Sequence, residues 1–124
     1  MRILIVDDSR IMRNIVKNTL TALRYPGTFL EAADGDEAWS VLEAEEVSLL
    51  LLDWNIPGLN GLELVKKLRA TAKFQGLPII MITSQAAKYN VIEAVKAGVN
   101  DYLVKPVKEE ALEEKLRRVI GRPS

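Results

Sequence analysis

Four short apolar runs in the chain each end on residues that can handle a phosphate group or a metal ion. These residues are Asp7-Asp8, Asp53, Thr83-Ser84 and Lys105-Pro106. If the runs are parallel strands, their end groups meet at one edge of one sheet, where open α/β sheets bind ligands. The chain would then present three carboxylates, hydroxyl groups and an amine at a single crevice.

The three carboxylates of this crevice, Asp7, Asp8 and Asp53, would repel one another strongly at a separation of a few ångströms. A divalent cation would compensate that repulsion. Because the chain contains no His and no Cys, the available donors are hard oxygens, which favour Mg²⁺. In proteins Mg²⁺ binds one or two carboxylates together with waters and phosphate oxygens. We therefore expect Mg²⁺ as the cofactor.

The same set of groups suits the transfer of a phosphoryl group to a carboxylate. A carboxylate would attack phosphorus, Mg²⁺ and Lys105 would offset the charge on the equatorial oxygens, and Thr83 would donate to a phosphoryl oxygen. Each group also has an ordinary structural explanation, as a helix cap, an Asx turn or a strand-ending turn. Their occurrence together at successive strand ends favours the functional interpretation.

Length and charge restrict the class of protein. At 124 residues the chain has the size of one domain. Lys plus Arg and Asp plus Glu both number 17, so the formal net charge is zero. Binders of nucleic acid or membrane surfaces usually carry a basic excess, so we expect neither partner. No apolar run approaches the roughly 18 residues of a membrane span, and no signal-peptide pattern is present. We expect a soluble, cytoplasmic protein.

Strand and helix patterns alternate five times along the chain. Ser9 is predicted to cap a first helix whose apolar face carries Ile11, Ile15, Leu20 and Leu23, and Asp34-Gly35 is predicted to be a turn. The predicted strands are 2–6, 28–32, 47–52, 79–82 and 101–104, and the later helices 37–45, 61–72, 86–97 and 109–120. Five such units predict a doubly wound (βα)5 α/β fold around a five-stranded parallel sheet. Periodicity alone does not give the strand order.

Five motifs together resemble response-regulator receiver domains, and within them the single-domain chemotaxis type. They are Val6-Asp7-Asp8-Ser9, the run 53–61 that begins Asp53-Trp54-Asn55, Met81-Ile82-Thr83-Ser84, Gly98-Val99-Asn100-Asp101-Tyr102 and Val104-Lys105-Pro106. The resemblance covers essentially all of residues 1–124 as one receiver domain. It implies the flavodoxin-like strand order 2-1-3-4-5.

The resemblance also implies roles for the residues of the crevice. Asp53 would be the phosphoacceptor. Asp8 and Asp53 would bind Mg²⁺ through their carboxylates, Asn55 through its backbone carbonyl, and Asp7 mainly through water. Lys105 would contact the phosphoryl group and Asp53, and the peptide bond that joins Lys105 to the following proline would be cis.

A conformational switch follows from the same resemblance. On phosphorylation Thr83 would move toward the phosphoryl group, Tyr102 would turn inward into the vacated space, and Ser84 would donate its backbone N–H to the phosphate. The surface that reads out the switch would consist of Lys88, Val91, Val95, Tyr102, Val104 and Lys115. Without the resemblance, the two valines of residues 91–95 would simply pack the helix, and the two lysines would be ordinary solvated surface residues.

The partners implied are a histidine kinase as phosphodonor, a protein target such as a flagellar motor switch protein, and a phosphatase. We expect a monomer that phosphorylates and dephosphorylates itself and does not turn over an external substrate. One residue departs from the family pattern: Gln85 stands where the best-known chemotaxis receivers carry an acid, which leaves the lifetime of the phosphorylated state open.

Three other interpretations stay open. The chain could be a receiver cut from a larger regulator with a DNA-binding or enzymatic domain after Ser124. It could be an aspartate-nucleophile phosphatase, although such enzymes usually carry Asp-x-Asp after the first strand and a cap insertion. It could be a flavin carrier of the same topology, although Asp7-Asp8-Ser9-Arg10 would repel a phosphate unless a metal intervened.

Overall fold

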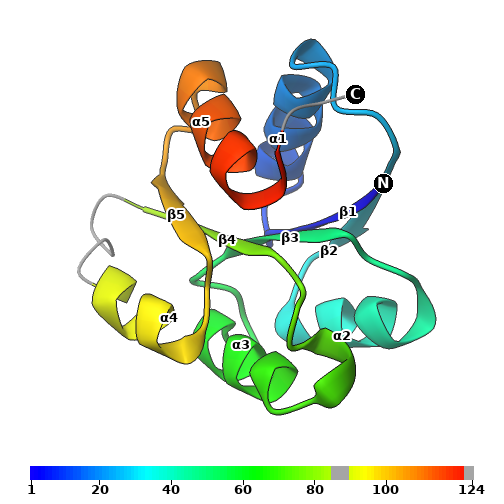
Figure 1. Ribbon diagram of the computed structural model, residues 1–124, viewed down its shortest axis with the longest axis vertical. Helices are drawn as coiled ribbons and strands as arrows, with labels where there is room; N and C mark the ends of the chain where they lie inside the picture. Colours follow the sequence, from blue (N-terminus) through cyan, green and yellow to red (C-terminus); the bar gives the residue numbers. More distant parts are fainter. Residues whose placement is uncertain (85–89, 122–124) are drawn as a thin grey trace.

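Strands and helices alternate along the chain, as the sequence predicts. The computed structural model describes residues 1–84 and 90–121. Its elements are β1 (Arg2–Val6), α1 (Arg10–Ala22), β2 (Thr28–Ala32), α2 (Gly35–Ala44), β3 (Leu49–Asp53), α3 (Gly61–Arg69), the 3-10 turn η1 (Ala72–Phe74), β4 (Ile79–Thr83), α4 (Val91–Ala97), β5 (Asp101–Val104) and α5 (Glu109–Ile120) (Figure 1). The strands pair in parallel in the order β2-β1-β3-β4-β5, which confirms the predicted fold and strand order.

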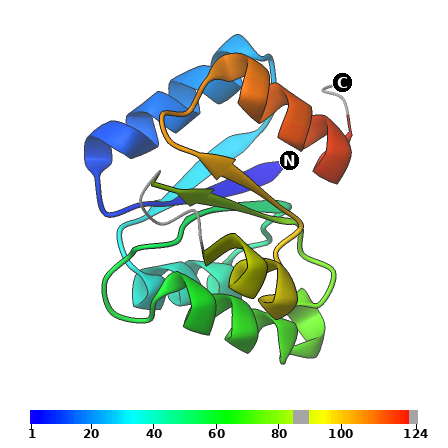
Figure 2. The ribbon, with the colours of Figure 1, turned by 90° about the vertical axis from the view of Figure 1, so that its left-hand side faces the viewer.

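Helices cover both faces of the sheet. Helices α1 and α5 lie on one face, and α2, α3 and α4 lie on the other (Figures 1 and 2). The central strand β3 serves both cores, because successive side chains of a strand point to opposite faces. Leu49 and Leu51 pack in the core under α1 and α5, and Leu50 and Leu52 in the core under the other three helices. All four are fully buried, which explains why β3 is apolar from Leu49 to Leu52.

Several predicted boundaries were wrong by a few residues. Helix α2 begins at Gly35 because the Asp34 side chain accepts the N–H of Glu37 as an N-cap, so Asp34 starts a helix and not a free turn. Strand β3 begins at Leu49 and includes Asp53. Helix α3 ends at Arg69, and a separate 3-10 turn follows. The predicted start of the fourth helix at residue 86 lies outside the described residues.

The apolar face predicted for the first helix was wrong at two positions. Ser9 caps α1 as expected, with its hydroxyl accepting the N–H of Met12 at 3.2 Å. The buried residues of α1 are Val16 and Leu20, whereas Ile11 is 73% exposed and Ile15 is 39% exposed. The helix therefore meets the sheet along the stripe through Val16 and Leu20. The two isoleucines lie on other faces of the helix, Ile11 largely in solvent.

Arg69 ties α3 to the segments around it. Its guanidinium donates to the carbonyl oxygens of Gly98 at 2.8 and 3.1 Å, of Phe74 at 2.8 Å and of Gln75 at 3.2 Å, and to Oδ1 of Asn100 at 3.2 Å. No carboxylate contacts it among the described residues, and burial lowers the pKa of Arg69 from its usual value. One side chain thus holds the end of α4, the start of β5 and η1 together.

Both ends of the described chain lie at the edge of the sheet where the strands begin. The Met1 carbonyl accepts the N–H of Thr28 at 3.0 Å, beside the start of β1. The buried Tyr25 donates its hydroxyl to the carbonyl oxygen of Gly121, just after α5, at 3.1 Å. Within residues 1–84 and 90–121, no helix is long and apolar enough to span a membrane.

Candidate functional site

The strand order brings the predicted crevice residues to one edge of the sheet. Strands β1 and β3 are neighbours, with Val6 in register with Leu52, so Asp7, directly after β1, lies beside Asp53, the last residue of β3. Strand β4 lies beside β3 and ends at Thr83, which pairs with Val104 of β5. Lys105 follows β5 directly, so all four strand ends deliver their groups to the same edge. Its peptide bond to the next residue is cis, as the resemblance implied.

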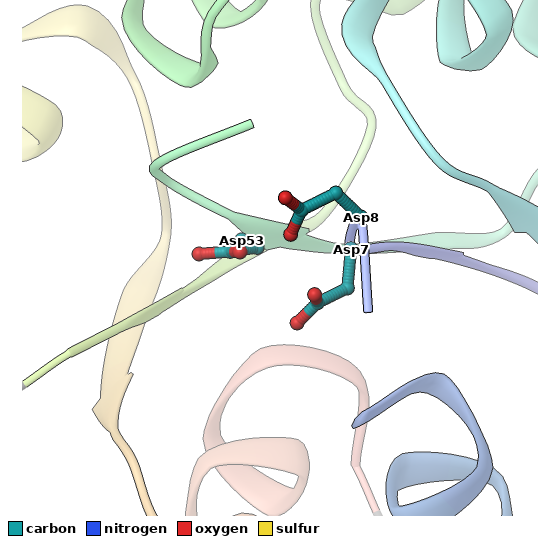
Figure 3. A group of neighbouring side chains, drawn as sticks. All are labelled: Asp7, Asp8 and Asp53. Atoms are coloured by element: carbon teal, nitrogen blue, oxygen red, sulfur yellow. The ribbon is translucent and has the colours of Figure 1, made fainter. Parts of the chain in front are cut away.

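Three carboxylates lie together at this edge. One oxygen from each of Asp7, Asp8 and Asp53 can be chosen so that all three lie within 4.8 Å of one another. Asp7 and Asp53 are each 5% exposed, whereas Asp8 is open to solvent. Figure 3 shows Asp7 and Asp8 reaching to opposite sides of the sheet from the end of β1, with Asp53 beside them at the end of β3. The sequence prediction of an acidic crevice is therefore confirmed in its geometry.

Lys105 is the cation of the cluster. Its Nζ lies 3.1 Å from Oδ2 of Asp7 and 3.5 Å from Oδ2 of Asp53. Burial raises the pKa of Asp53; Lys105 acts against that rise, and Asp7 adds to it. Burial would lower the pKa of Lys105, but the Asp53 and Asp7 carboxylates outweigh it and raise the pKa overall. One amine therefore pairs with two of the three acids, and the edge has more acidic than basic side chains.

Backbone N–H groups and one arginine fix the loops that carry the acids. Oδ1 of Asp7 accepts the N–H of Ser9 at 2.8 Å, and Oδ1 of Asp53 accepts the N–H of Asn55 at 3.3 Å. Arg13 donates to the carbonyl oxygen of Asp7 at 2.6 Å. These bonds orient the carboxylates before any ligand arrives, which lowers the ordering cost of binding.

The donor set fits Mg²⁺. It consists of carboxylate oxygens held close together, with an uncompensated negative charge and without His or Cys. The exposed Asn55 lies in the loop after Asp53 and lines the same pocket as Asp8, and its backbone carbonyl would be a further oxygen ligand. Asp7, Asp8, Asp53 and Asn55 would hold the ion.

Thr83 carries a buried hydroxyl that has no protein partner in the described part of the chain. The residue is fully buried at the end of β4, and its Oγ1 is the buried side-chain polar atom left without a hydrogen bond there. Such orphaned groups are rare and usually have a functional or solvent explanation. A hydroxyl in this position is free to donate to an oxygen that arrives at the edge. Ser84, next in the chain, is half-buried.

The residues predicted to form the readout surface lie on α4, β5 and α5. Val95 is 54% exposed and Tyr102 is 36% exposed, while Val91, Val104 and Lys115 are half-buried. Lys88 lies outside the described residues. Sequence reasoning missed Ile92, which is 71% exposed on α4. Its spacing of three residues from Val95 was the available signal, because residues three apart share a helix face.

A cavity of about 530 Å³ adjoins the acidic edge on the side of α4. It is lined by Asp8, Trp54, Asn55, Ile56, Pro57, Asn60, Leu62, Asn90 and Glu93. Sequence reasoning did not place Asn90 and Glu93 near the site. They precede or begin a helix whose position depends on tertiary packing, and they belong to none of the motifs.

Comparison with known proteins gives a consistent result. Residues 3–117 match the family model of the response regulator receiver domain. A chemotaxis protein CheY homolog of Campylobacter jejuni is 53% identical over 98% of this chain and 93% of its own length. Chemotaxis protein CheY1 of Helicobacter pylori is 52% identical over 98% of both chains. The receiver domain of a Pseudomonas aeruginosa sensor histidine kinase, solved with a magnesium ion in its active site cleft, has a TM-score of 0.84 and 32% identity over 97% of both chains.

Proposed function

Since the chain belongs to the response regulator receiver family, we propose that it takes a phosphoryl group from a histidine kinase onto Asp53. Its similarity to CheY proteins over nearly the whole chain makes it a phosphoacceptor response regulator of chemotaxis. The observation that carries the residue assignment is the buried Asp53 carboxylate, which lies beside two further acids and Lys105. The same edge holds the Thr83 hydroxyl, which has no hydrogen-bond partner within residues 1–84 and 90–121.

The chemistry assigned to each residue follows from its place at the edge. An oxygen of Asp53 attacks phosphorus, and the bond to the leaving group of the donor breaks in line with it. Lys105 stabilises the negative charge on the phosphoryl oxygens, and the hydroxyl of Thr83 and the backbone N–H of Ser84 donate to them. When bound by the acids and the Asn55 carbonyl, Mg²⁺ supplies the remaining charge compensation.

Thr83 and Tyr102 form the proposed switch. The phosphoryl group offers the Thr83 hydroxyl an acceptor, so phosphorylation favours the conformation in which this hydroxyl reaches that group. Tyr102 is partly exposed on the neighbouring strand and turns inward as Thr83 moves. The event at Asp53 thereby changes the surface formed by α4, β5 and α5.

That surface is the proposed docking site for a target such as a flagellar motor switch protein. CheY-like receivers are signalling proteins and not enzymes that turn over an external substrate. We further propose that this chain acts as a cytoplasmic monomer, that it phosphorylates itself from small donors, and that it loses the phosphoryl group by its own hydrolysis or to a phosphatase.

The test is incubation with acetyl phosphate and Mg²⁺, followed by separation on a phosphate-affinity gel. We expect a shifted band that is absent when a chelator removes the metal. Absence of a shift, together with absence of any spectroscopic response to beryllofluoride, would contradict a phosphate-accepting receiver. Steady release of product from a phosphate ester would instead favour the aspartate-nucleophile phosphatase.

Thr83→Ala and Lys105→Ala should separate phosphorylation from the conformational response. Coupling between two sites is typically worth about 1–3 kcal/mol. We expect most of it to be lost in both variants, because the phosphoryl group no longer contacts β4 through Thr83 or the end of β5 through Lys105. The measurement is the fluorine NMR signal of fluorotyrosine at position 102 with and without beryllofluoride and Mg²⁺. Thr21→Ala, on the exposed face of α1, is the matched control. A full response in both variants would contradict the switch.

A further inference from the structure

A second group of charged residues surrounds Tyr102, away from the acidic edge. Asp101, the first residue of β5, pairs through Oδ1 with Nζ of Lys115 on α5 at 3.2 Å. Its Oδ2 lies 3.9 Å from Arg118. The Asp101 side chain is 13% exposed and that of Lys115 is 18% exposed. This pair is therefore far better shielded than the α5 surface pairs, in which the side chains of Arg117 and Arg118 are 53% and 62% exposed.

Lys115 also contacts the switch tyrosine. Its Nζ lies 5.0 Å from the centroid of the Tyr102 ring, within the range of a cation–π interaction. The same ammonium thus touches the Asp101 carboxylate and the face of the tyrosine. Because a free lysine side chain samples many rotamers, its position over the ring depends on the carboxylate that holds it.

Asp101 acts on Tyr102 through the backbone as well. Oδ1 of Asp101 accepts the N–H of Tyr102 at 2.8 Å. An asparagine at this position keeps an oxygen for that N–H but loses the charge that holds Lys115. The two contributions of Asp101 can therefore be separated by one substitution.

We propose that Asp101 is a positioning residue of the switch, which holds Tyr102 in its outward position through Lys115. The inference rests on the proposed function and deepens it. An interaction changes a two-state equilibrium only if it differs between the states. The cation–π contact exists while the ring lies outside, and an inward turn of Tyr102 breaks it. The Asp101–Lys115 pair therefore lowers the fraction of unphosphorylated protein in the inward, active conformation.

The expected size of the effect follows from the contact that is lost. A cation–π interaction at a partly exposed ring corresponds to an about two- to fivefold change in an equilibrium constant. Asp101→Asn should raise the inward population of Tyr102 by this factor without phosphorylation. The population is measured by fluorine NMR of fluorotyrosine-labelled full-length protein, with the Tyr102 signal assigned by its loss in Tyr102→Phe.

Glu113→Gln is the matched control. It also removes one acid from the region, but Glu113 pairs with Arg117 and not with Lys115. We expect no change in the Tyr102 signal in this variant. An equal shift in Asp101→Asn and Glu113→Gln would overturn the proposal, because the effect would then come from net charge.

A double-mutant cycle tests whether Asp101 acts through Lys115. Lys115→Met keeps the apolar stem and removes the cation, and it should shift the Tyr102 signal as far as Asp101→Asn does. In the Lys115→Met background, Asp101→Asn should cause no further shift. Full additivity of the two shifts would overturn the proposal. Lys115→Arg should retain the outward population, because a guanidinium can both pair with the carboxylate and stack on the ring.

The same samples separate failure of this inference from failure of the proposed function. Beryllofluoride with Mg²⁺ should move the Tyr102 signal of the unaltered protein. If it does not, the switch itself is wrong and the inference falls with it. If it does, while Asp101→Asn matches Glu113→Gln, the inference alone is wrong.

Discussion

Asp53→Asn is expected to abolish labelling by acetyl phosphate and Mg²⁺ completely. The amide occupies the same space as the carboxylate but offers no anionic oxygen to attack phosphorus. Asp7 lies near, but Lys105 holds its Oδ2 at 3.1 Å and the N–H of Ser9 holds its Oδ1 at 2.8 Å. Asp7 is therefore held more tightly than Asp53, whose oxygens lie 3.3 Å from the backbone nitrogen of Asn55 and 3.5 Å from Nζ of Lys105. The measurement is the shifted band on a phosphate-affinity gel.

Asp36→Asn is the control for that experiment, since Asp36 is an exposed acid in the first turn of α2, outside the carboxylate cluster. It should be labelled like the unaltered protein. Full labelling of Asp53→Asn would place the acceptor elsewhere and would overturn the site assignment.

The loss of labelling in Asp53→Asn should not come from unfolding. Burial, together with Asp7, raises the pKa of Asp53, so the folded state binds its proton more tightly than the unfolded state. Ionised Asp53 then destabilises the metal-free fold at neutral pH. This penalty decreases as pH falls through the raised pKa of the folded state, and it is gone below the unfolded pKa of about 3.9. In the presence of a chelator, thermal unfolding of Asp53→Asn at neutral pH should occur at or above the temperature of the unaltered protein.

Arg69→Met should destabilise the fold by roughly 2–4 kcal/mol, because it leaves several partly buried carbonyl oxygens without a donor. The residue makes five hydrogen bonds of 2.8 to 3.2 Å to Phe74, Gln75, Gly98 and Asn100. Methionine keeps much of the apolar volume, so the substitution isolates the loss of the donors. The free energy of unfolding is measured by urea denaturation with linear extrapolation.

Two further variants define the cause of that loss. Arg117→Met removes an exposed arginine whose pairing is with Glu113 on the same helix, and it should change stability by less than about 1 kcal/mol. Arg69→Lys keeps the positive charge but replaces the planar guanidinium, with its several donors, by a single ammonium group. Its stability should lie between those of Arg69→Met and Arg117→Met. Equal stabilities of Arg69→Met and Arg117→Met would show that the bonds of Arg69 contribute nothing.

The sequence could predict the strands and the site edge because both leave local signals. The run before Asp53 is apolar on both faces, as a strand buried under helices on both sides must be. Polar groups at the strand ends then meet for any parallel arrangement in which those strands are neighbours. The strand order itself came from the resemblance to a family, since periodicity carries no information on which strands pair.

The remaining features could not be predicted because their partners are distant in sequence or are backbone atoms. Arg69 bonds mainly to carbonyl oxygens, and any residue type supplies a carbonyl, so no motif marks the contact. Asp101 and Lys115 form a pair that depends on the packing of α5 against β5. Ile11 and Ile15 have helical spacing, but the sheet meets α1 along a different face, through Val16 and Leu20. All of these features depend on tertiary packing, which overrides the preferences of the local sequence.

The position of the chain ends has a practical consequence for assays. Met1 lies at the start of β1, and Tyr25 holds the chain at Gly121 after α5, whereas the acidic edge lies at the opposite ends of the strands. Figures 1 and 2 show the N-terminus and the end of α5 on the same side of the molecule. Immobilisation on a sensor chip, or fusion of a fluorescent reporter, through either end would leave the reactive edge facing bulk solvent. The immobilised protein could then be phosphorylated with a small phosphoryl donor, and the binding of targets could be measured in the same flow cell.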